Sequence, residues 1–371
     1  MRVVFCGGGT GGHVYPALTV AAALRRATEG KQPLDILYIG VKGKMDRELV
    51  VREGIAFRAV TAGPLRVCSA LGTAQGLWRL LIGTAEAYML LGRFRPDAVF
   101  ATGGYGSVGV GLAAKLRGRP LLLFLPDVEA GLAVRVLAKV AARIAVTVDA
   151  ALKGMPKGKT IVTGYPVRPS FFGVDREQAR RCLGLHPSLP TLFVSGASLG
   201  ANRINKAVVN WAADFLRVGQ IIHLCGGTDE AWLKRERQKL PLELQERYRV
   251  YSYLHENISM ALASADVAVM RSGGSALGEL PAVGLPAILV PGEYEGWDQS
   301  PNARYLEQAG AAIMLPQSRL GELQKNVMSL LADGEKRERM RQALARLSCP
   351  QAADRLAQIL LDIGGKARAG A

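Results

Sequence analysis

The chain has 371 residues, of which 49% are hydrophobic, and its 47 Lys and Arg outnumber its 31 Asp and Glu to give a formal net charge of +16. This length and apolar fraction suit two α/β domains, and the charge favours an acidic partner such as a phosphorylated substrate or an anionic membrane surface. The five cysteines are scattered without metal-ligand spacing, and no zinc-finger, RNP-like or basic heptad motif is present, which argues against disulfides, structural zinc and nucleic acid binding.

The N-terminus and the apolar runs predict neither a secretory signal nor a membrane-spanning helix. Residue 1 leads directly into an apolar strand pattern, without the charged and apolar regions of a signal peptide. The nearest candidate for a span, residues 80–91, is interrupted by Glu86 and falls short of the ~20 residues that a membrane helix needs. We therefore expect a soluble or peripheral protein.

The first predicted elements are a strand at residues 2–6, a glycine-rich turn at residues 7–12 and a helix. Five residues of that turn are glycine, so its backbone can approach a ligand closely and the helix start can hold an anion. A plain tight turn is the alternative. His13 favours the ligand site, because an imidazole suits acid/base chemistry beside a bound anion. The predicted phosphate or acceptor loop comprises Thr10, Gly11 and Gly12.

The segment 66–95 mixes apolar and aromatic residues with arginine. An interfacial helix shows this mixture, with Arg beside its apolar face, and an ordinary core-packing helix is the alternative. Basic residues at 115–119 extend the same predicted docking face. The residues that we predict to meet a membrane are Trp78, Arg79, Leu81, Lys115 and Arg117.

Strand patterns alternate with helical patterns along the whole chain and form two series. The predicted strands after the first are residues 34–39, 98–101, 120–124, 143–148 and 160–163, and then 191–194, 221–224, 249–252, 267–270 and 287–290. Such alternation predicts an α/β protein with two Rossmann-like, doubly wound parallel sheets. Prolines and a glycine at residues 163–169 mark the boundary, so we predict domains at 1–164 and 165–350, followed by a helix and a frayed tail at 351–371.

Two further turns of small residues follow strands of the second series, at residues 195–201 and 271–279. Two anion-holding turns in one domain suit a nucleotide diphosphate. Glu279 lies one helical turn beyond the second of them, where a carboxylate can accept hydrogen bonds from the two hydroxyls of a ribose. A solvated glutamate on a helix face is the alternative.

Six segments, taken in order, resemble the MurG family of bacterial glycosyltransferases. They are residues 8–13, 103–105, 164–168, 196–201, 271–279 and 298–303. The resemblance implies a GT-B fold, with two Rossmann-like domains facing across a cleft. It implies inverting transfer of N-acetylglucosamine from UDP-GlcNAc to the C4 hydroxyl of undecaprenyl-diphospho-MurNAc-pentapeptide, which makes lipid II for peptidoglycan of the cell wall. The expected place is the cytoplasmic face of the plasma membrane.

The resemblance also assigns roles to positions of this chain. Arg168 and the turn around Gly273, Gly274, Ser275 and Ala276 hold the diphosphate with Ser198 and Gly200, and Glu279 binds the ribose. Gln299 and Asn302 contact the sugar, while Leu254 and His255 stand at the uracil turn. Asn205, together with Tyr105 of the loop containing Gly103 and Gly104, lines the expected cleft. No Asp-x-Asp motif is evident, so we expect a metal-independent enzyme that needs no cofactor.

Departures from the family pattern cluster on the acceptor side. Phe124, Leu125, Pro126 and Asp127 stand where the family usually has His-Glu-Gln-Asn, and Tyr165 replaces an Asn. Asp127 is therefore the second candidate for the catalytic base after His13. Three alternatives stay open: a related GT-B enzyme with a different lipid or small-molecule acceptor, a UDP-sugar 2-epimerase, and an inactive nucleotide-sugar-binding protein.

Overall fold

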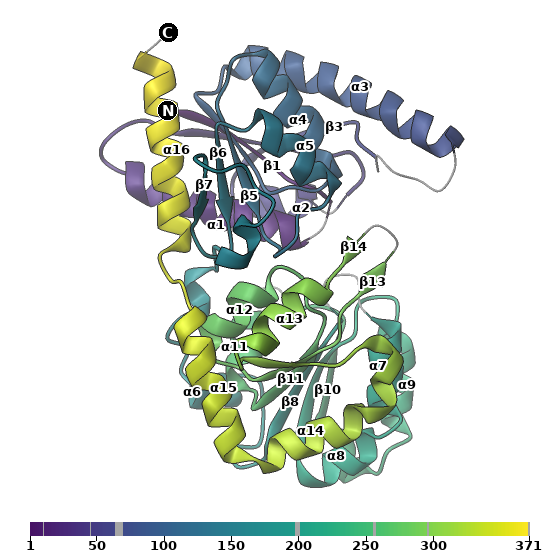
Figure 1. Ribbon diagram of the computed structural model, residues 1–371. Helices are drawn as coiled ribbons and strands as arrows, with labels where there is room; N and C mark the ends of the chain where they lie inside the picture. The colour runs from purple at the N-terminus through teal and green to yellow at the C-terminus, as the bar shows by residue number, and fades with distance from the viewer. Residues whose placement is uncertain are drawn as a thin grey trace. The chain divides into compact units, whose positions relative to one another are not determined.

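The structure is a computed structural model that describes residues 1–9, 11–44, 46–63, 70–196, 201–254, 257–294 and 297–369. The chain divides into two compact units, one of Met1–Val167 with Gln351–Ala371 and one of Arg168–Pro350 (Figure 1). Each unit has its own parallel sheet covered by helices. Both sheets confirm the predicted fold class of two Rossmann-like α/β domains.

The first unit is built on a seven-stranded parallel sheet with the order β3-β2-β1-β4-β5-β6-β7. Its strands are β1 (Arg2–Cys6), β2 (Asp35–Val41), β3 (Ala56–Val60), β4 (Ala98–Ala101), β5 (Leu121–Leu125), β6 (Arg143–Val146) and β7 (Thr160–Val162). The strand order reverses between β1 and β4, so the turns after these two strands lie side by side at one edge of the sheet.

The helices of the first unit pack on the two faces of this sheet. They are α1 (Gly11–Thr28), α2 (Asp46–Arg52), α3 (Ala70–Phe94), α4 (Tyr105–Leu116), α5 (Leu132–Val140), the 3-10 helix η1 (Asp149–Leu152) and α16 (Ala352–Ala369). Helix α16 packs on α1 and β4, and Arg368 pairs with Asp97 at 2.6 Å. Residues 364–369, which we predicted to fray, therefore continue a packed helix.

The second unit has a six-stranded parallel sheet with the order β10-β9-β8-β11-β12-β15. Its strands are β8 (Thr191–Ser195), β9 (Gln220–Leu224), β10 (Tyr248–Tyr251), β11 (Val267–Met270), β12 (Ala287–Leu289) and β15 (Ala312–Met314), and an antiparallel pair, β13 (Glu293–Tyr294) and β14 (Trp297–Asp298), lies outside the sheet. Here the order reverses between β8 and β11, the strands that precede the two predicted turns of this domain.

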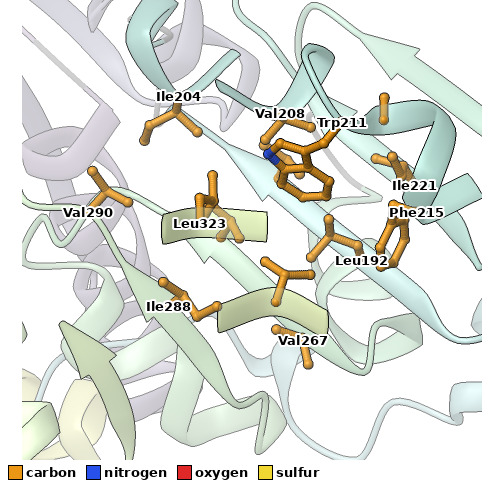
Figure 2. Close-up of a cluster of buried hydrophobic side chains, with 14 of the residues drawn as sticks. Leu192, Ile204, Val208, Trp211, Phe215, Ile221, Val267, Ile288, Val290 and Leu323 are labelled. Carbon is orange, nitrogen blue, oxygen red and sulfur yellow. The ribbon is translucent and has the colours of Figure 1, made fainter. Parts of the chain in front are cut away.

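The helices of the second unit cover both faces of its sheet. They are η2 (Pro169–Phe171), α6 (Arg176–Cys182), α7 (Asn202–Val209), α8 (Ala212–Val218), α9 (Glu230–Gln238), α10 (Leu242–Gln245), α11 (Ile258–Ser264), α12 (Ala276–Val283), α13 (Ser300–Gln308), η3 (Gln317–Glu322), α14 (Leu323–Ala332) and α15 (Gly334–Leu347). Leu192, Val267 and Ile288 of the sheet gather with side chains of α7 and α14 in one buried apolar cluster (Figure 2). This cluster fixes the sheet from which the turn after β11 projects.

Candidate active site

The turns that follow β1 and β4 approach each other closely at glycine positions of the first unit. A Cβ on Gly8 would lie 3.0 Å from Cα of Gly104, so the two turns approach each other through backbone alone. Gly103 and Gly104 have φ angles of 82° and 74°, a region that favours glycine. The glycines at these positions are thus required by the backbone, and the close approach leaves N–H groups at the carboxyl edge of the sheet.

His13, in the first turn of α1, lies against these glycines with its ring orientation fixed. Its Nδ1 donates a hydrogen bond to the carbonyl oxygen of Thr102 at 2.8 Å, and the Thr102 hydroxyl donates to the carbonyl of His13 at 2.8 Å. The ring passes within 3.3 Å of the Cβ position of Gly104. Because Nδ1 holds the proton in the neutral tautomer, Nε2 is the atom that can accept another.

Two other predicted residues stand at the same edge of the sheet. Tyr105 begins α4, and its hydroxyl oxygen lies 3.2 Å from the Cβ position of Gly9. Asp127 is half-buried and follows the last residue of β5, the strand next to β4, by two positions. The structure therefore brings His13 and Tyr105 to one pair of turns, with Asp127 beyond the neighbouring strand.

The turn after β11 is the centre of the second unit's candidate site, and buried polar side chains hold it. Asn302 donates from Nδ2 to the carbonyl of Ser272 at 2.9 Å, and the Ser272 hydroxyl donates to the carbonyl of Gln299 at 3.0 Å. Gln299 accepts the N–H of Gly292 at 2.8 Å, while its Nε2 lies 3.3 Å from the Cβ position of Gly273. Gln299 and Asn302 thus support the turn at residues 272–273.

Glu279, in α12, stands one helical turn beyond this turn and interacts electrostatically with Arg168. Burial raises the pKa of the Glu279 carboxyl to about 7, against the opposing effects of the Arg168 guanidinium and a hydrogen bond with Ser275. Arg168 itself lies over the ring of Phe171, with 5.1 Å between its guanidinium carbon and the ring centroid. A carboxyl and a guanidinium therefore stand beside a turn that is suited to an anion.

Comparisons with known proteins agree with this geometry. The model of the glycosyltransferase family 28 N-terminal domain matches residues 3–146, and that of the family's C-terminal domain matches residues 191–356. A Roseiflexus protein named UDP-N-acetylglucosamine–N-acetylmuramyl-(pentapeptide) pyrophosphoryl-undecaprenol N-acetylglucosamine transferase is 39% identical, covering 97% of this chain and 94% of the relative. The chain belongs to glycosyltransferase family 28.

Solved structures show the same fold for this family 28 chain. MurG of Acinetobacter baumannii superposes with a TM-score of 0.72 at 24% identity, covering 97% of this chain and 99% of that one. A UDP-GlcNAc 2-epimerase from Neisseria meningitidis, bound to UDP-GlcNAc, superposes with a TM-score of 0.68 at 13% identity, covering 98% of this chain and 100% of that one. At these sequence identities the solved structures show only that the fold is shared. The similarity to the transferases comes from relatives such as the Roseiflexus protein.

Asn205 of this family 28 chain is fully buried, at 0% exposure, inside a polar network. Its Nδ2 donates to Asp229 at 2.7 Å and to the carbonyl of Cys225 at 2.9 Å, and its Oδ1 accepts from Nε2 of His223 at 2.9 Å. Tyr248 completes the chain by donating to Nδ1 of His223 at 2.9 Å. The Asn205 side chain thus ties α7 to the end of β9. Its predicted place in the cleft stays a prediction.

Several predicted site residues have other outcomes. Thr10, Ser198, Gly200 and His255 lie outside the described residues, and Leu254 is half-buried beyond the end of β10. Among the residues that the structure describes, no group of three His, Cys, Asp or Glu side chains is placed to hold a metal ion. In the same part of the chain, no helix has both the length and the apolar character to cross a membrane.

The structure adds residues that sequence reasoning missed. Thr102 orients His13, and Ser272 links the turn after β11 to Gln299. Arg271 is buried and donates to the carbonyls of Val290 and Pro291. Thr102 and Ser272 could have been found from the sequence, because each directly precedes a predicted glycine turn. The partners of Arg271 could not, because they come from a segment that is distant in the sequence.

The pKa of Glu279 predicts how UDP binding depends on pH. In its predicted role, the Glu279 carboxylate accepts hydrogen bonds from the ribose hydroxyls, so binding would favour the ionised form and lower the pKa of this carboxyl from about 7. The affinity for UDP should be constant above pH 7 and fall as the pH drops through 7, by at most about tenfold per pH unit. Calorimetric titration with UDP between about pH 8 and pH 5.5 checks this dependence. Glu279→Gln should remove the dependence, except for the part that ionisation of UDP itself contributes.

Proposed function

We propose that this chain transfers N-acetylglucosamine from UDP-GlcNAc to the C4 hydroxyl of an undecaprenyl-diphosphate-linked N-acetylmuramoyl-pentapeptide, with inversion at the anomeric carbon. The observation that carries the proposal is the 39% identity, over 97% of the chain, to a relative named for this transfer. The glycine turns at the reversal points of both sheets support it, because such points are where open α/β sheets bind ligands.

On the donor side, the second unit supplies groups suited to a nucleotide diphosphate. In our proposal, N–H groups of the turn at residues 272–275 and the guanidinium of Arg168 stabilise the diphosphate as it leaves. Glu279 accepts hydrogen bonds from the ribose hydroxyls. Nε2 of Gln299 lies 3.3 Å from the Cβ position of Gly273, and in our proposal it donates to a sugar or phosphate oxygen there. Ser198 and Gly200 complete the donor side by resemblance to the family.

On the acceptor side, the first unit supplies the base. We assign this role to Nε2 of His13, because the hydrogen bond to Thr102 holds the proton on Nδ1. Asp127 remains the second candidate, since it stands beyond the adjacent strand at the same edge. Tyr105 and the turn containing Gly103 and Gly104 border the same place and are suited to contact the acceptor.

The experiment that tests the proposal also separates it from the epimerase alternative. Release of UDP from UDP-GlcNAc should depend on the lipid-linked acceptor, because the C4 hydroxyl of the acceptor is the group that attacks the anomeric carbon. A 2-epimerase would produce the epimeric UDP-sugar when the acceptor is omitted. Acceptor-dependent UDP release with no epimer formed supports the transferase, whereas epimer formation in the absence of acceptor contradicts it.

We further propose that the enzyme works peripherally at the cytoplasmic face of the plasma membrane and docks through α3. The name of the Roseiflexus relative specifies a pyrophosphoryl-undecaprenol acceptor. Large apolar side chains at helical spacing are exposed along α3, including Leu77, Trp78, Leu81 and Met89, and Trp78 is 63% exposed. Lys115 on α4 and Arg117, directly after the end of α4, are exposed, and α4 packs against α3 through Gly109 and Gly83. An apolar stripe beside basic groups suits an anionic lipid surface.

Trp78→Glu combined with Leu81→Glu should lower co-sedimentation with anionic liposomes by at least about tenfold, because each side chain loses a burial contribution of ~1.5–3 kcal/mol. Leu242→Glu is the matched control, since Leu242 is 80% exposed on α10 of the other unit. Reversing the charges of Lys115 and Arg117 should weaken binding further and reduce its salt dependence. Unchanged liposome binding in both sets would rule out α3 as the docking element.

Metal independence and the lack of a cofactor are part of the proposal. The leaving diphosphate has helix N-termini and Arg168 to stabilise it, a role that a divalent cation plays in other enzymes. Turnover should therefore keep its rate in excess chelator. A complete loss of rate that added magnesium or manganese restores would overturn this prediction.

A further inference from the structure

Asp229 is a buried residue of the second unit whose carboxylate the proposed function has not used. It directly precedes α9, the position where an aspartate usually accepts N–H groups of its own helix. Within the described residues, its side chain makes no such bond. Its oxygens instead accept from α7: Nδ2 of Asn202 lies 3.0 Å from Oδ1 and 3.1 Å from Oδ2, and Nδ2 of Asn205 lies 2.7 Å from Oδ2. The carboxylate thus holds the first turn of a different helix.

The rest of this buried network fixes the orientation of the Asn205 amide. Its Nδ2 donates to two groups that can only accept, the carboxylate of Asp229 and the carbonyl of Cys225. Its Oδ1 therefore faces His223, which must carry its proton on Nε2 and accept from Tyr248 at Nδ1. Burial lowers the pKa of the His223 imidazole to about 3, so the ring is neutral at neutral pH. The amide cannot flip without losing hydrogen bonds, so α7 is held in one orientation on the sheet.

The helix that Asp229 holds begins at a turn that we assign to the donor diphosphate. Helix α7 starts at Asn202, directly after the turn predicted at residues 195–201, of which residues 197–200 lie outside the described residues. The backbone N–H of Asn205 donates to the carbonyl of Ala201, the last residue of that turn, at 2.9 Å. Anion binding at a helix start depends on where its N–H groups point, so a group that orients α7 also orients this side of the donor site.

We propose that Asp229 is a positioning residue for the donor: through Asn202 and Asn205, its carboxylate holds the start of α7 where this helix can bind the diphosphate of UDP-GlcNAc. The inference rests on the proposed function, which puts the diphosphate at this turn. Two other roles for Asp229 predict different results. A negative charge that merely lay near the diphosphate would repel it, so its loss would tighten binding. A side chain that only stabilised the fold would affect all ligands of this unit equally.

Binding of UDP to Asp229→Asn tests the inference. An amide accepts through one oxygen only, so the NH₂ group of the new side chain would face the NH₂ group of Asn202 and release the start of α7. The Kd for UDP should rise about three- to tenfold. The Kd for uridine, which lacks the phosphates, should not change. Calorimetry with UDP and NMR titration with uridine measure the two constants.

Asn202→Ala keeps the inference testable if Asp229→Asn does not fold, because Asn202 is exposed. This variant removes hydrogen bonds of the same contact without changing a charge, and the Kd for UDP should rise about two- to fivefold. Asn210→Ala is the matched control, since Asn210 is an exposed asparagine at the other end of the same helix. Its Kd for UDP should equal that of the wild type.

The outcomes separate this inference from the proposed function. Tighter or unchanged binding of UDP by either folded variant overturns the inference alone, as does an equal loss of affinity for UDP and for uridine. If the wild-type chain does not bind UDP, the proposed function fails and the inference fails with it. Weaker binding of UDP by both variants, with uridine binding and the Asn210→Ala control unchanged, supports the positioning role.

Discussion

Replacing His13 with alanine should lower kcat for the transfer by about 100- to 10,000-fold, the range that a positioned general base contributes. The affinity for UDP should not change, because the donor groups belong to the other compact unit. The physical reason is the fixed ring: Nδ1 is held by Thr102, so Nε2 alone is available to take the proton of the acceptor hydroxyl. Steady-state kinetics with a lipid-linked acceptor and calorimetry with UDP check the two parts.

Two variants make this result specific. His186→Ala removes an exposed histidine of the second unit and should behave as wild type. Asp127→Asn keeps the size of the second candidate base and removes its charge. If His13→Ala retains a near-normal kcat in a folded protein while Asp127→Asn loses it, the roles of the two residues must be exchanged.

Replacing Glu279 with alanine should raise the Kd for UDP, and the KM for UDP-GlcNAc, by about 10- to 100-fold. This range corresponds to losing charge-assisted hydrogen bonds of ~1.5–3 kcal/mol. The variant also removes the carboxyl that interacts with Arg168, so the diphosphate side of the site loses order as well. Calorimetry with UDP and initial rates at varied UDP-GlcNAc measure both constants.

The control for Glu279 is a glutamate of the same unit that has no place in the site. Glu243→Ala, on the exposed surface of α10, should leave both constants unchanged. Comparing the Kd values for UDP and 2′-deoxyUDP tests whether the lost affinity comes from the ribose hydroxyls. Glu279→Ala should abolish the preference for the nucleotide that has both hydroxyls. An unchanged preference would show that Glu279 does not bind the ribose.

The fold could be predicted from the sequence because parallel strands that are buried on both faces read as short apolar runs between helical patterns. The exceptions have physical causes. The edge strand β3 is interrupted by Arg58 and is partly exposed, and β15 has three residues, so neither gives a long apolar run. The pair β13 and β14 has two residues in each strand, and its formation depends on tertiary contacts.

The candidate site could be predicted where it depends on backbone. The turns after β1, β4 and β11 need glycine or small residues, so they were visible as motifs. The side-chain partners were not visible, because they come from distant segments. Asn205 and Asn302 were predicted to meet the ligand; their amides form hydrogen bonds within the protein, and their contact with a ligand stays a prediction.

The central claim is that this family 28 chain joins a UDP-linked sugar to a lipid-linked acceptor. The most direct measurement follows radiolabelled N-acetylglucosamine from UDP-GlcNAc into a synthetic undecaprenyl-diphosphate-type acceptor that carries N-acetylmuramoyl-pentapeptide, with UDP release recorded in parallel. We expect the label to enter the lipid product in step with UDP release, and this incorporation to fall in Glu279→Ala when UDP-GlcNAc is kept below the raised KM of the variant. Binding of UDP-GlcNAc without any transfer to that acceptor would contradict the account.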